Sequence, residues 1–174
     1  MPYGVVLLPS RATHARLAAL AATVAGPSRI SALGDRAPAH VSVAHFDGPA
    51  DAVRERTAAH PHRSLTVKVI GLLYTVVPEG DYYVPEGGVY FGVEMVRRPD
   101  LNALHTEVLG WIAEAGATPL GAVGPDFRPH ITLGMTRSPQ LPPLTEFPLG
   151  EIPVTLAFGE LGPYGTFPGL TPPA

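Results

Sequence analysis

Short apolar runs separated by glycine and proline are the feature that most constrains the fold of this chain. The 174 residues include 19 Gly and 21 Pro, which stand between the apolar runs as punctuation. This spacing is typical of many short strands joined by tight turns. We expect strands at 3–8, 40–46, 65–77, 89–96, 131–135 and 154–158.

Helical spacing of apolar residues is less frequent. It runs from Leu17 until Gly26, and a short polar segment at 50–59 also favours a helix. Pro99 opens a third amphipathic segment, which ends at Gly116. Strands therefore outnumber helices and follow one another closely. This order favours an α+β fold with a mostly antiparallel sheet over a doubly wound parallel sheet.

Length and charge exclude several classes of protein. A chain of 174 residues fits one domain, so we expect residues 1–174 to form a single domain. The formal net charge of −3 and the absence of a Gly-rich phosphate-binding loop argue against bulk binding to long nucleic acids and against nucleotide-cofactor folds. No Cys is present, which excludes disulfides and thiolate metal sites. Without a targeting segment or a long apolar run, we expect a cytoplasmic protein that does not contact membranes.

Two segments share an unusual pattern of side chains. Segments 40–44 and 130–134 both contain His, apolar, hydroxyl, apolar and small residues in that order, just after a proline. Both lie in predicted strands, where residues two apart share a face. We expect one face of each strand to carry His40, Ser42 and Ala44, and His130, Thr132 and Gly134, respectively. Because imidazoles titrate near neutral pH, such a pair suits general acid–base catalysis.

The other histidines fit this pattern less well. His62 is also followed by a hydroxyl, but the proline and charges around it predict a loop, and a metal site with His60 would lack a third ligand. His45 lies an odd number of positions from the first motif histidine, so an unbroken strand places it on the opposite face. His105 shares a helical face with apolar residues and is expected in the core. His14, in the first turn of a helix, is expected to be exposed.

With these motifs the chain resembles the two-histidine (2H) phosphoesterase superfamily, which includes the bacterial 2′-5′ RNA ligase-like proteins and the cyclic phosphodiesterases. Its members carry two His-x-Thr/Ser (HxT) motifs on strands, and here the second motif histidine lies 90 positions after the first. Segment 127–133 is similar to the second motif over its whole length, whereas the first motif has Ser42 where Thr is commoner. Many members carry a basic residue shortly after the second motif, but here the next cation is Arg137.

The resemblance implies a fold and a set of roles. It implies two pseudo-symmetric lobes with outer helices, one motif in each lobe, and an active-site cleft between them. His40 and His130 would act as general base and general acid, in either assignment, and Ser42 and Thr132 would bind the phosphate oxygens. No metal or cofactor is required. Arg128, two residues before the second motif, would face the phosphate if the strand starts early; otherwise it is an exposed charge beside a proline.

The implied activity is metal-independent opening of a 2′,3′-cyclic phosphate to a 2′-phosphate, on an RNA end or a cyclic nucleotide. The main alternative is 2′-5′ RNA ligation, in which a ribose 5′-hydroxyl replaces water at the same site. A non-catalytic RNA- or nucleotide-binding module and a histidine–metal hydrolase are further alternatives. We expect a monomer. The slightly negative net charge favours small or terminal substrates over long RNA.

Tyrosines flank the Gly/Pro-rich loop at 80–88. Tyr82, Tyr83 and Tyr90 could stack on a base, as aromatic platforms do on single strands. Strand packing and anchoring of the loop are the alternative explanation for the same residues.

Overall fold

One antiparallel sheet dominates the computed structural model, which describes residues 2–34, 37–82, 84–142 and 150–174. Eight strands in this part of the chain form the sheet, and their pairings are antiparallel. The elements are β1 (Pro2–Pro9), α1 (Arg11–Ala25), β2 (Arg29–Ala32), β3 (Val41–Asp47), α2 (Asp51–Ala59), β4 (Ser64–Val77), β5 (Gly88–Met95), α3 (Pro99–Glu114), β6 (Thr118–Leu120), β7 (His130–Thr136) and β8 (Gly150–Glu160), with 3₁₀ turns η1 (Gly26–Ser28), η2 (Gly124–Asp126) and η4 (Pro163–Gly165). The predicted α+β fold is confirmed.

The strand order divides the sheet into two equivalent halves. The order is β2-β7-β5-β4-β8-β1-β3-β6, so each half has a short edge strand next to a strand that carries one motif. β3 and β7 also pair with each other through Val41 and Ile131, and this extra pairing closes the sheet on itself. The two lobes implied by the resemblance are therefore two halves of one closed sheet, and the motif strands meet where these halves join.

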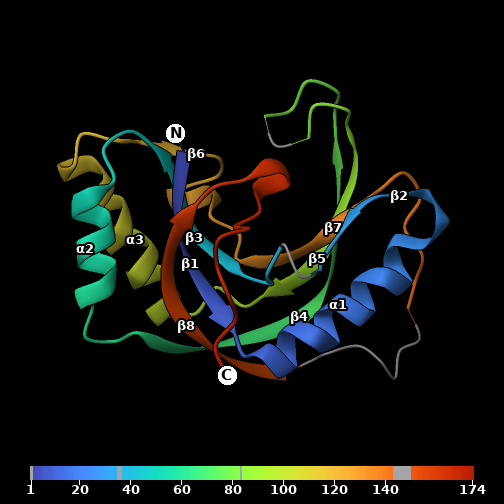
Figure 1. Ribbon diagram of the computed structural model, residues 1–174, viewed down its shortest axis with the longest axis horizontal. Coiled ribbons are helices and arrows are strands. Elements are labelled where there is room, and N and C mark those ends of the chain that lie inside the picture. Colours follow the sequence, from blue (N-terminus) through green and yellow to red (C-terminus); the bar gives the residue numbers. More distant parts are fainter. Residues whose placement is uncertain (1, 35–36, 83, 143–149) are drawn as a thin grey trace.

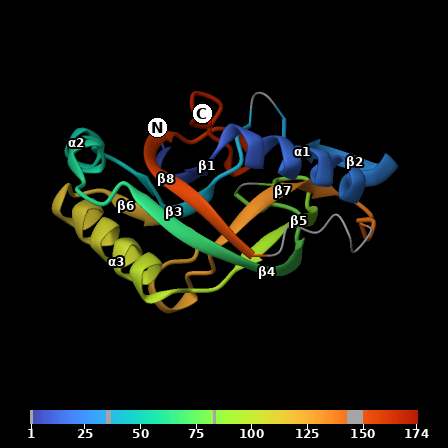
Figure 2. The same ribbon diagram turned by 90° about the horizontal axis from the view of Figure 1, so that it is seen from below.

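The helices cover the outside of the sheet. α1 packs against β7 and β2, α3 packs against β3 and β6, and α2 lies against α3 and β8. Figure 1 shows α2 and α3 on one side of the molecule and α1 on the other, and Figure 2 shows the same separation from below. The main hydrophobic core joins the sheet to α1 and α3. None of the helices in the described residues is long and apolar enough to span a membrane.

Local sequence explains where the two long helices begin and end. The Ser10 hydroxyl accepts a hydrogen bond from the Thr13 amide and caps α1, and Gly26, with a φ of 58°, ends it. Pro99 stands in the first turn of α3, where its missing N–H would have had no helical partner. The spacing predicts a buried face of Leu17, Leu20, Ala21 and Val24 in α1 and of Leu101, Leu104, His105, Val108, Leu109 and Ile112 in α3. All of these residues are buried except Leu109, which is half-buried.

The sequence does not predict the two edge strands that border the motif strands. β2 has four residues and β6 has three, which is too short for an alternating pattern to stand out. β2 pairs with β7, and β6 pairs with β3. Both edge strands therefore depend on the motif strand beside them.

Candidate active site

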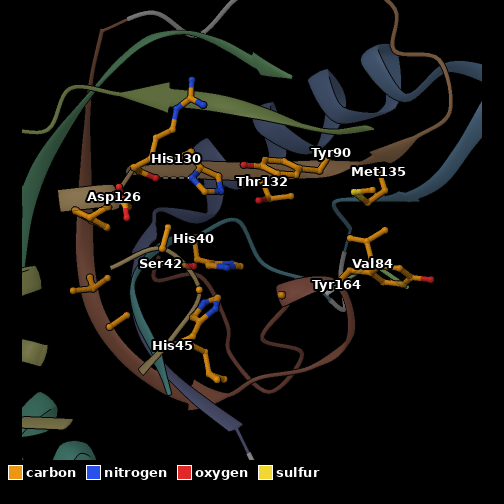
Figure 3. A pocket seen from close by; sticks show the side chains of 18 residues that line it. His40, Ser42, His45, Val84, Tyr90, Asp126, His130, Thr132, Met135 and Tyr164 are labelled. Atoms are coloured by element: carbon orange, nitrogen blue, oxygen red, sulfur yellow. Dashed lines mark hydrogen bonds between the residues drawn. The ribbon is translucent and has the colours of Figure 1, made fainter. Parts of the chain in front are cut away.

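The two His-x-hydroxyl motifs meet where β3 and β7 pair. Val41 and Ile131, the middle residues of the motifs, face each other in antiparallel register. Pairing at this point places each motif histidine opposite the hydroxyl residue of the other strand. Figure 3 shows His130 and Thr132 on one side of a pocket and His40 and Ser42 on the other. The fold thus brings together the four residues that we expected to be catalytic.

An open pocket of about 320 Å³ lies over this junction. Besides the motifs, its lining comes from the chain between β6 and β7, from β5 with the loop before it, and from the C-terminal segment. The lining side chains include His40, Ser42, His45, Val84, Tyr90, Asp126, Phe127, Arg128, His130, Thr132, Met135 and Tyr164. A pocket of this size suits a small-molecule ligand.

Each motif histidine makes the same hydrogen bond to the main chain. His40 Nδ1 lies 2.9 Å from the carbonyl oxygen of Pro38, and His130 Nδ1 lies 2.7 Å from that of Arg128. A carbonyl oxygen only accepts, so Nδ1 carries the hydrogen in both rings and Nε2 holds a lone pair. Nε2 is therefore the nitrogen of each ring that can exchange a proton with a ligand, and at His40 the main chain of Gly165 lies within hydrogen-bonding reach of the ring as well.

Burial keeps both motif histidines neutral at neutral pH. It lowers the pKa of His40 to about 4; the hydrogen bonds to the main chain of Pro38 and Gly165 offset only part of this effect, and the neighbouring His130 adds to it. Burial also lowers the pKa of His130, while the bond to the Arg128 carbonyl and the nearby Glu94 carboxylate act in the opposite direction. An anionic ligand between the rings would favour a proton on one of them.

A β-bulge follows the hydroxyl residue in each motif strand. On β3, Ser42 and Ala44 pair with consecutive residues of β1, so Val43 is an extra residue. On β7, Leu133 is extra in the same way opposite β5. An extra residue reverses the alternation of side chains beyond it.

The bulges interrupt the alternation of side chains that was expected along both strands. Ala44 is buried in the main core and also borders the pocket, whereas a Cβ atom on Gly134 would lie 2.5 Å from the carbonyl oxygen of Ser31 on β2. Ala44 therefore borders the pocket as predicted, but the predicted faces of His45 and Gly134 were wrong. The residues three positions after each hydroxyl, His45 and Met135, line the pocket.

His45 is a pocket residue that the sequence pattern placed on the wrong face. The bulge at Val43 turns it toward the pocket, where its ring centroid lies 5.5 Å from that of Phe167. Burial, followed by the neighbouring His40 and His130, lowers the pKa of His45 to about 3. A third neutral imidazole therefore borders the pocket.

Arg128 borders the pocket, but its guanidinium forms an ion pair with the carboxylate of Glu94. Its Nε donates a hydrogen bond of 2.7 Å to Glu94 Oε1, and Glu94 pairs across the sheet with His130. This hydrogen bond lowers the pKa of Glu94. Because the Arg128 side chain is 53% exposed, it has room to move, and a contact with phosphate would compete with Glu94.

Among the tyrosines considered for base stacking, Tyr90 lines the pocket. Its ring lies 5.6 Å from the His130 ring, with 26° between the planes. Tyr82 is 64% exposed and lies away from this pocket, and Tyr83 is outside the described residues. Stacking on a base is thus geometrically open to Tyr90, in addition to its packing against His130.

The C-terminal segment forms part of the pocket wall, and the sequence did not predict this role. Turn η4 borders the pocket, and Phe167 is fully buried with its ring 4.8 Å from the His40 ring, edge to face. Tyr164, in η4, has a φ of 57°, and its hydroxyl donates a hydrogen bond of 2.8 Å to Glu86 Oε1. The glycines and proline at 162–165 predict a turn, but no local signal indicates that it reaches the first motif.

The remaining histidines do not line the pocket. His105 is buried in α3, as expected, and His60 and His62 lie in the predicted loop. No group of three or more His, Asp or Glu side chains in the described ranges is placed to hold a metal ion. His14, expected to be exposed, is half-buried, and its Nδ1 accepts a hydrogen bond of 3.1 Å from the Ala39 amide. It thus holds the chain directly before the first motif.

No family model matches the chain, and no curated protein matches it. Several solved structures are similar to it, and two of them are described here. The structure of Usb1 from Kluyveromyces marxianus with uridine monophosphate aligns with a TM-score of 0.47 and 12% identity, over 78% of this chain and 71% of that chain. The PDE domain of MHV ns2 aligns with a TM-score of 0.42 and 13% identity, over 90% of this chain and 99% of that chain. At this level of similarity, the function has to be inferred from the residues of this protein.

Proposed function

We propose that this protein is a metal-independent phosphodiesterase of the 2H type, which opens 2′,3′-cyclic phosphates to 2′-phosphates. One observation carries the proposal: two His-x-hydroxyl motifs lie on paired strands at one pocket, and both imidazoles bond the main chain through Nδ1. Two such rings can serve as base and acid, each worth roughly 10²–10⁴-fold in rate. The similarity of both motifs to the 2H superfamily supports the same reaction.

The proposed step is an in-line attack of water on the cyclic phosphorus. One motif imidazole accepts a proton from the water at Nε2 as the new P–O bond forms. The other imidazole, protonated at Nε2, donates its proton to the ribose 3′-oxygen as the P–O3′ bond breaks, which leaves a 2′-phosphomonoester. The Ser42 and Thr132 hydroxyls donate hydrogen bonds to the non-bridging oxygens as their negative charge grows. The phosphate anion favours the proton on the acidic ring, which has a low pKa in the free protein.

The pocket and the charge support a small or terminal substrate. The volume of about 320 Å³ suits one nucleotide better than a long chain, and a net charge of −3 provides no overall attraction to long RNA. Tyr90 can stack on a base, and Arg128 can exchange Glu94 for a phosphate oxygen. We infer that the substrate is a nucleoside 2′,3′-cyclic phosphate or the cyclic-phosphate end of an RNA.

Ligation is the second candidate, and the symmetry of the pocket favours it. His40 and Ser42 on β3 form the first half-site, and His130 and Thr132 on β7 form the second. Because the same pair of groups lies on each side of the pocket, either ring can face an incoming hydroxyl. A ribose 5′-hydroxyl in place of water would give a 2′-5′ linkage by the same proton transfers. The monomeric state, the single domain over residues 1–174 and the cytoplasmic location stay predictions from the sequence.

Hydrolysis of 2′,3′-cyclic nucleotides in EDTA tests the proposed function. The wild-type protein should release the 2′-phosphate isomer. His40→Ala and His130→Ala should each lose at least about 10²-fold in kcat/KM while staying folded, because each removes the base or the acid. Near-wild-type activity in either variant would show that the substituted histidine is neither the general base nor the general acid.

The controls distinguish the alternatives. His62→Ala, which changes a loop histidine away from the pocket, should keep the wild-type rate. Addition of an RNA with a 5′-hydroxyl tests ligation, because a joined product would show transfer to the ribose in place of water. Folded wild-type protein that binds a cyclic nucleotide without turnover would point to the non-catalytic binding role.

A further inference from the structure

His105, on α3, joins the two half-sites from outside the pocket. Its side chain is 1% exposed, and its Nδ1 lies 2.6 Å from the carbonyl oxygen of Val43, the extra residue in the β3 bulge. Its Nε2 lies 2.9 Å from the Gly124 amide, in the loop that leads to β7. Because the carbonyl only accepts and the amide only donates, the ring is neutral and carries its hydrogen on Nδ1.

The bond to Val43 holds the bulge that shapes the first half-site. Val43 stands between the residue of β3 that pairs with β7 and those that pair with β6. The equivalent carbonyl in the second half-site, that of Leu133, accepts a hydrogen bond of 2.8 Å from the Leu33 amide. The bulge carbonyl of the second half-site is thus bonded by a main-chain amide, whereas that of the first half-site is bonded by the His105 imidazole.

The bond to Gly124 holds the loop that enters the second half-site. After Gly124 the chain passes through Phe127 and reaches His130. The His105 ring stacks on the Phe127 ring, with centroids 3.9 Å apart and planes 4° apart. Arg97 lies 5.5 Å from the same ring and donates a hydrogen bond of 2.7 Å to the Gly124 carbonyl oxygen. The approach to the second motif is therefore fixed against α3.

We propose that His105 is a positioning residue that sets the distance between the two half-sites. It does not line the pocket, so it acts through the residues that it holds, which are Ser42 and His45 beside the bulge and His130 after the loop. A rigid link matters because a misplacement of about 1 Å between reacting groups can cost about 10²-fold in rate. This inference rests on the proposed phosphodiesterase activity of the same pocket.

The alternative is a core histidine that acts through packing alone. Phenylalanine has a similar shape and would keep the stacking on Phe127, so it removes both hydrogen bonds with little loss of volume. The two bonds can also be separated. An Asn amide nitrogen can take the place of Nδ1 and donate to Val43, and a Gln amide oxygen can take the place of Nε2 and accept from Gly124.

Steady-state kinetics of His105→Phe, His105→Asn and His105→Gln with a nucleoside 2′,3′-cyclic phosphate test the inference. In His105→Phe, kcat should fall about 10- to 100-fold with a smaller change in KM, and the Asn and Gln variants should each recover part of the loss. Val108→Ala, on the same buried face of α3, is the matched control. It should lower the thermal midpoint while kcat stays within about twofold of wild type. Wild-type kcat in a destabilised His105→Phe would overturn the positioning role.

A second readout separates this inference from the proposed function. NMR titration of the His40 and His130 imidazoles reports on the half-sites whether or not the protein turns over the nucleotide. In His105→Phe the pKa values of both histidines should move toward the ordinary value, whereas Val108→Ala should leave them unchanged. A wild-type protein without turnover would count against the proposed function. Unchanged titrations in His105→Phe would overturn the positioning role.

Discussion

A carbonyl group only two residues away orients each motif histidine. The partner of His40 Nδ1 is Pro38, and the partner of His130 Nδ1 is Arg128. Because these partners are so close in the chain, the local backbone sets that Nδ1 carries the hydrogen in both rings. The hydroxyl follows two positions later on the same face, before the bulge. These four side chains are therefore the part of the site that is most readable from the sequence.

Removal of one hydroxyl should slow the reaction without affecting the fold. Ser42→Ala and Thr132→Ala should each lower kcat/KM by about 10-fold or more, because one donor to the phosphate oxygens is lost. Both side chains are half-buried, so circular dichroism should show an intact fold. Ser64→Ala, which removes the exposed hydroxyl of the third His-x-Ser match, is the control and should keep the wild-type rate. Equal rates in all three variants would exclude the motif hydroxyls from the phosphate site.

Strands and helices are predicted well here, but the direction of side chains beyond each bulge is not. His45 has the wrong predicted face because the bulge depends on how β3 pairs with β1, and no pattern within β3 reveals it. The bulge in β7 likewise lies opposite Gly92 of β5, where the two strands approach closely. Pairing between strands, rather than their own composition, sets which residues share the pocket.

A methyl group at Gly92 should disturb the second motif strand. It would overlap the carbonyl oxygen of Ile131, so Gly92→Ala should lower the free energy of unfolding by roughly 1–3 kcal/mol and also lower kcat/KM. Denaturant unfolding and hydrolysis of a cyclic nucleotide measure the two effects. Gly71→Ala, on β4, meets open space and should change the unfolding free energy by less than about 0.5 kcal/mol. Equal unfolding midpoints in the two variants would contradict the close approach.

At the scale of the complete molecule, two features bury the histidines of the pocket: the sheet closes on itself, and the C-terminal segment packs against them. β3 and β7 meet because β1, β8, β4 and β5 carry the sheet round between them. Phe167 then packs against both His40 and His45, with ring centroids 4.8 and 5.5 Å away. Because burial lowers the pKa of these two histidines, the stability of the protein is linked to the neutral state of its site.

The buried histidines should make the protein less stable in mild acid. The pKa of His40 is about 4 in the folded protein and about 6.5 in the unfolded chain, so the unfolded state binds more protons between these values. The stabilisation should therefore be complete above about pH 6.5 and should fall as the pH decreases toward 4. From His40 alone, the unfolding free energies at about pH 7 and about pH 5 should differ by on the order of 2 kcal/mol, and His45 adds to this difference in the same direction.

Two substitutions test whether His40 contributes to this pH dependence of the unfolding free energy. His40→Gln should make it shallower without removing it, because His45 is buried as well and also binds its proton more weakly in the folded state. His62→Gln, at an exposed loop position, should leave it as in the wild type. Equal unfolding free energies of the wild-type protein at both pH values would contradict the burial of the site.

Local patterns in the chain were sufficient for the long strands, the helices and the four motif residues, because alternation, helical spacing and the His-x-hydroxyl spacing involve near neighbours. Contacts between distant segments set everything else: the two bulges, the partner of Arg128, the link through His105 and the cover provided by Phe167. The physical reason is that the residues of one strand do not specify which strands it pairs with or in which register. The register, and the side chains that it brings together, are fixed only when the closed sheet and its core are packed.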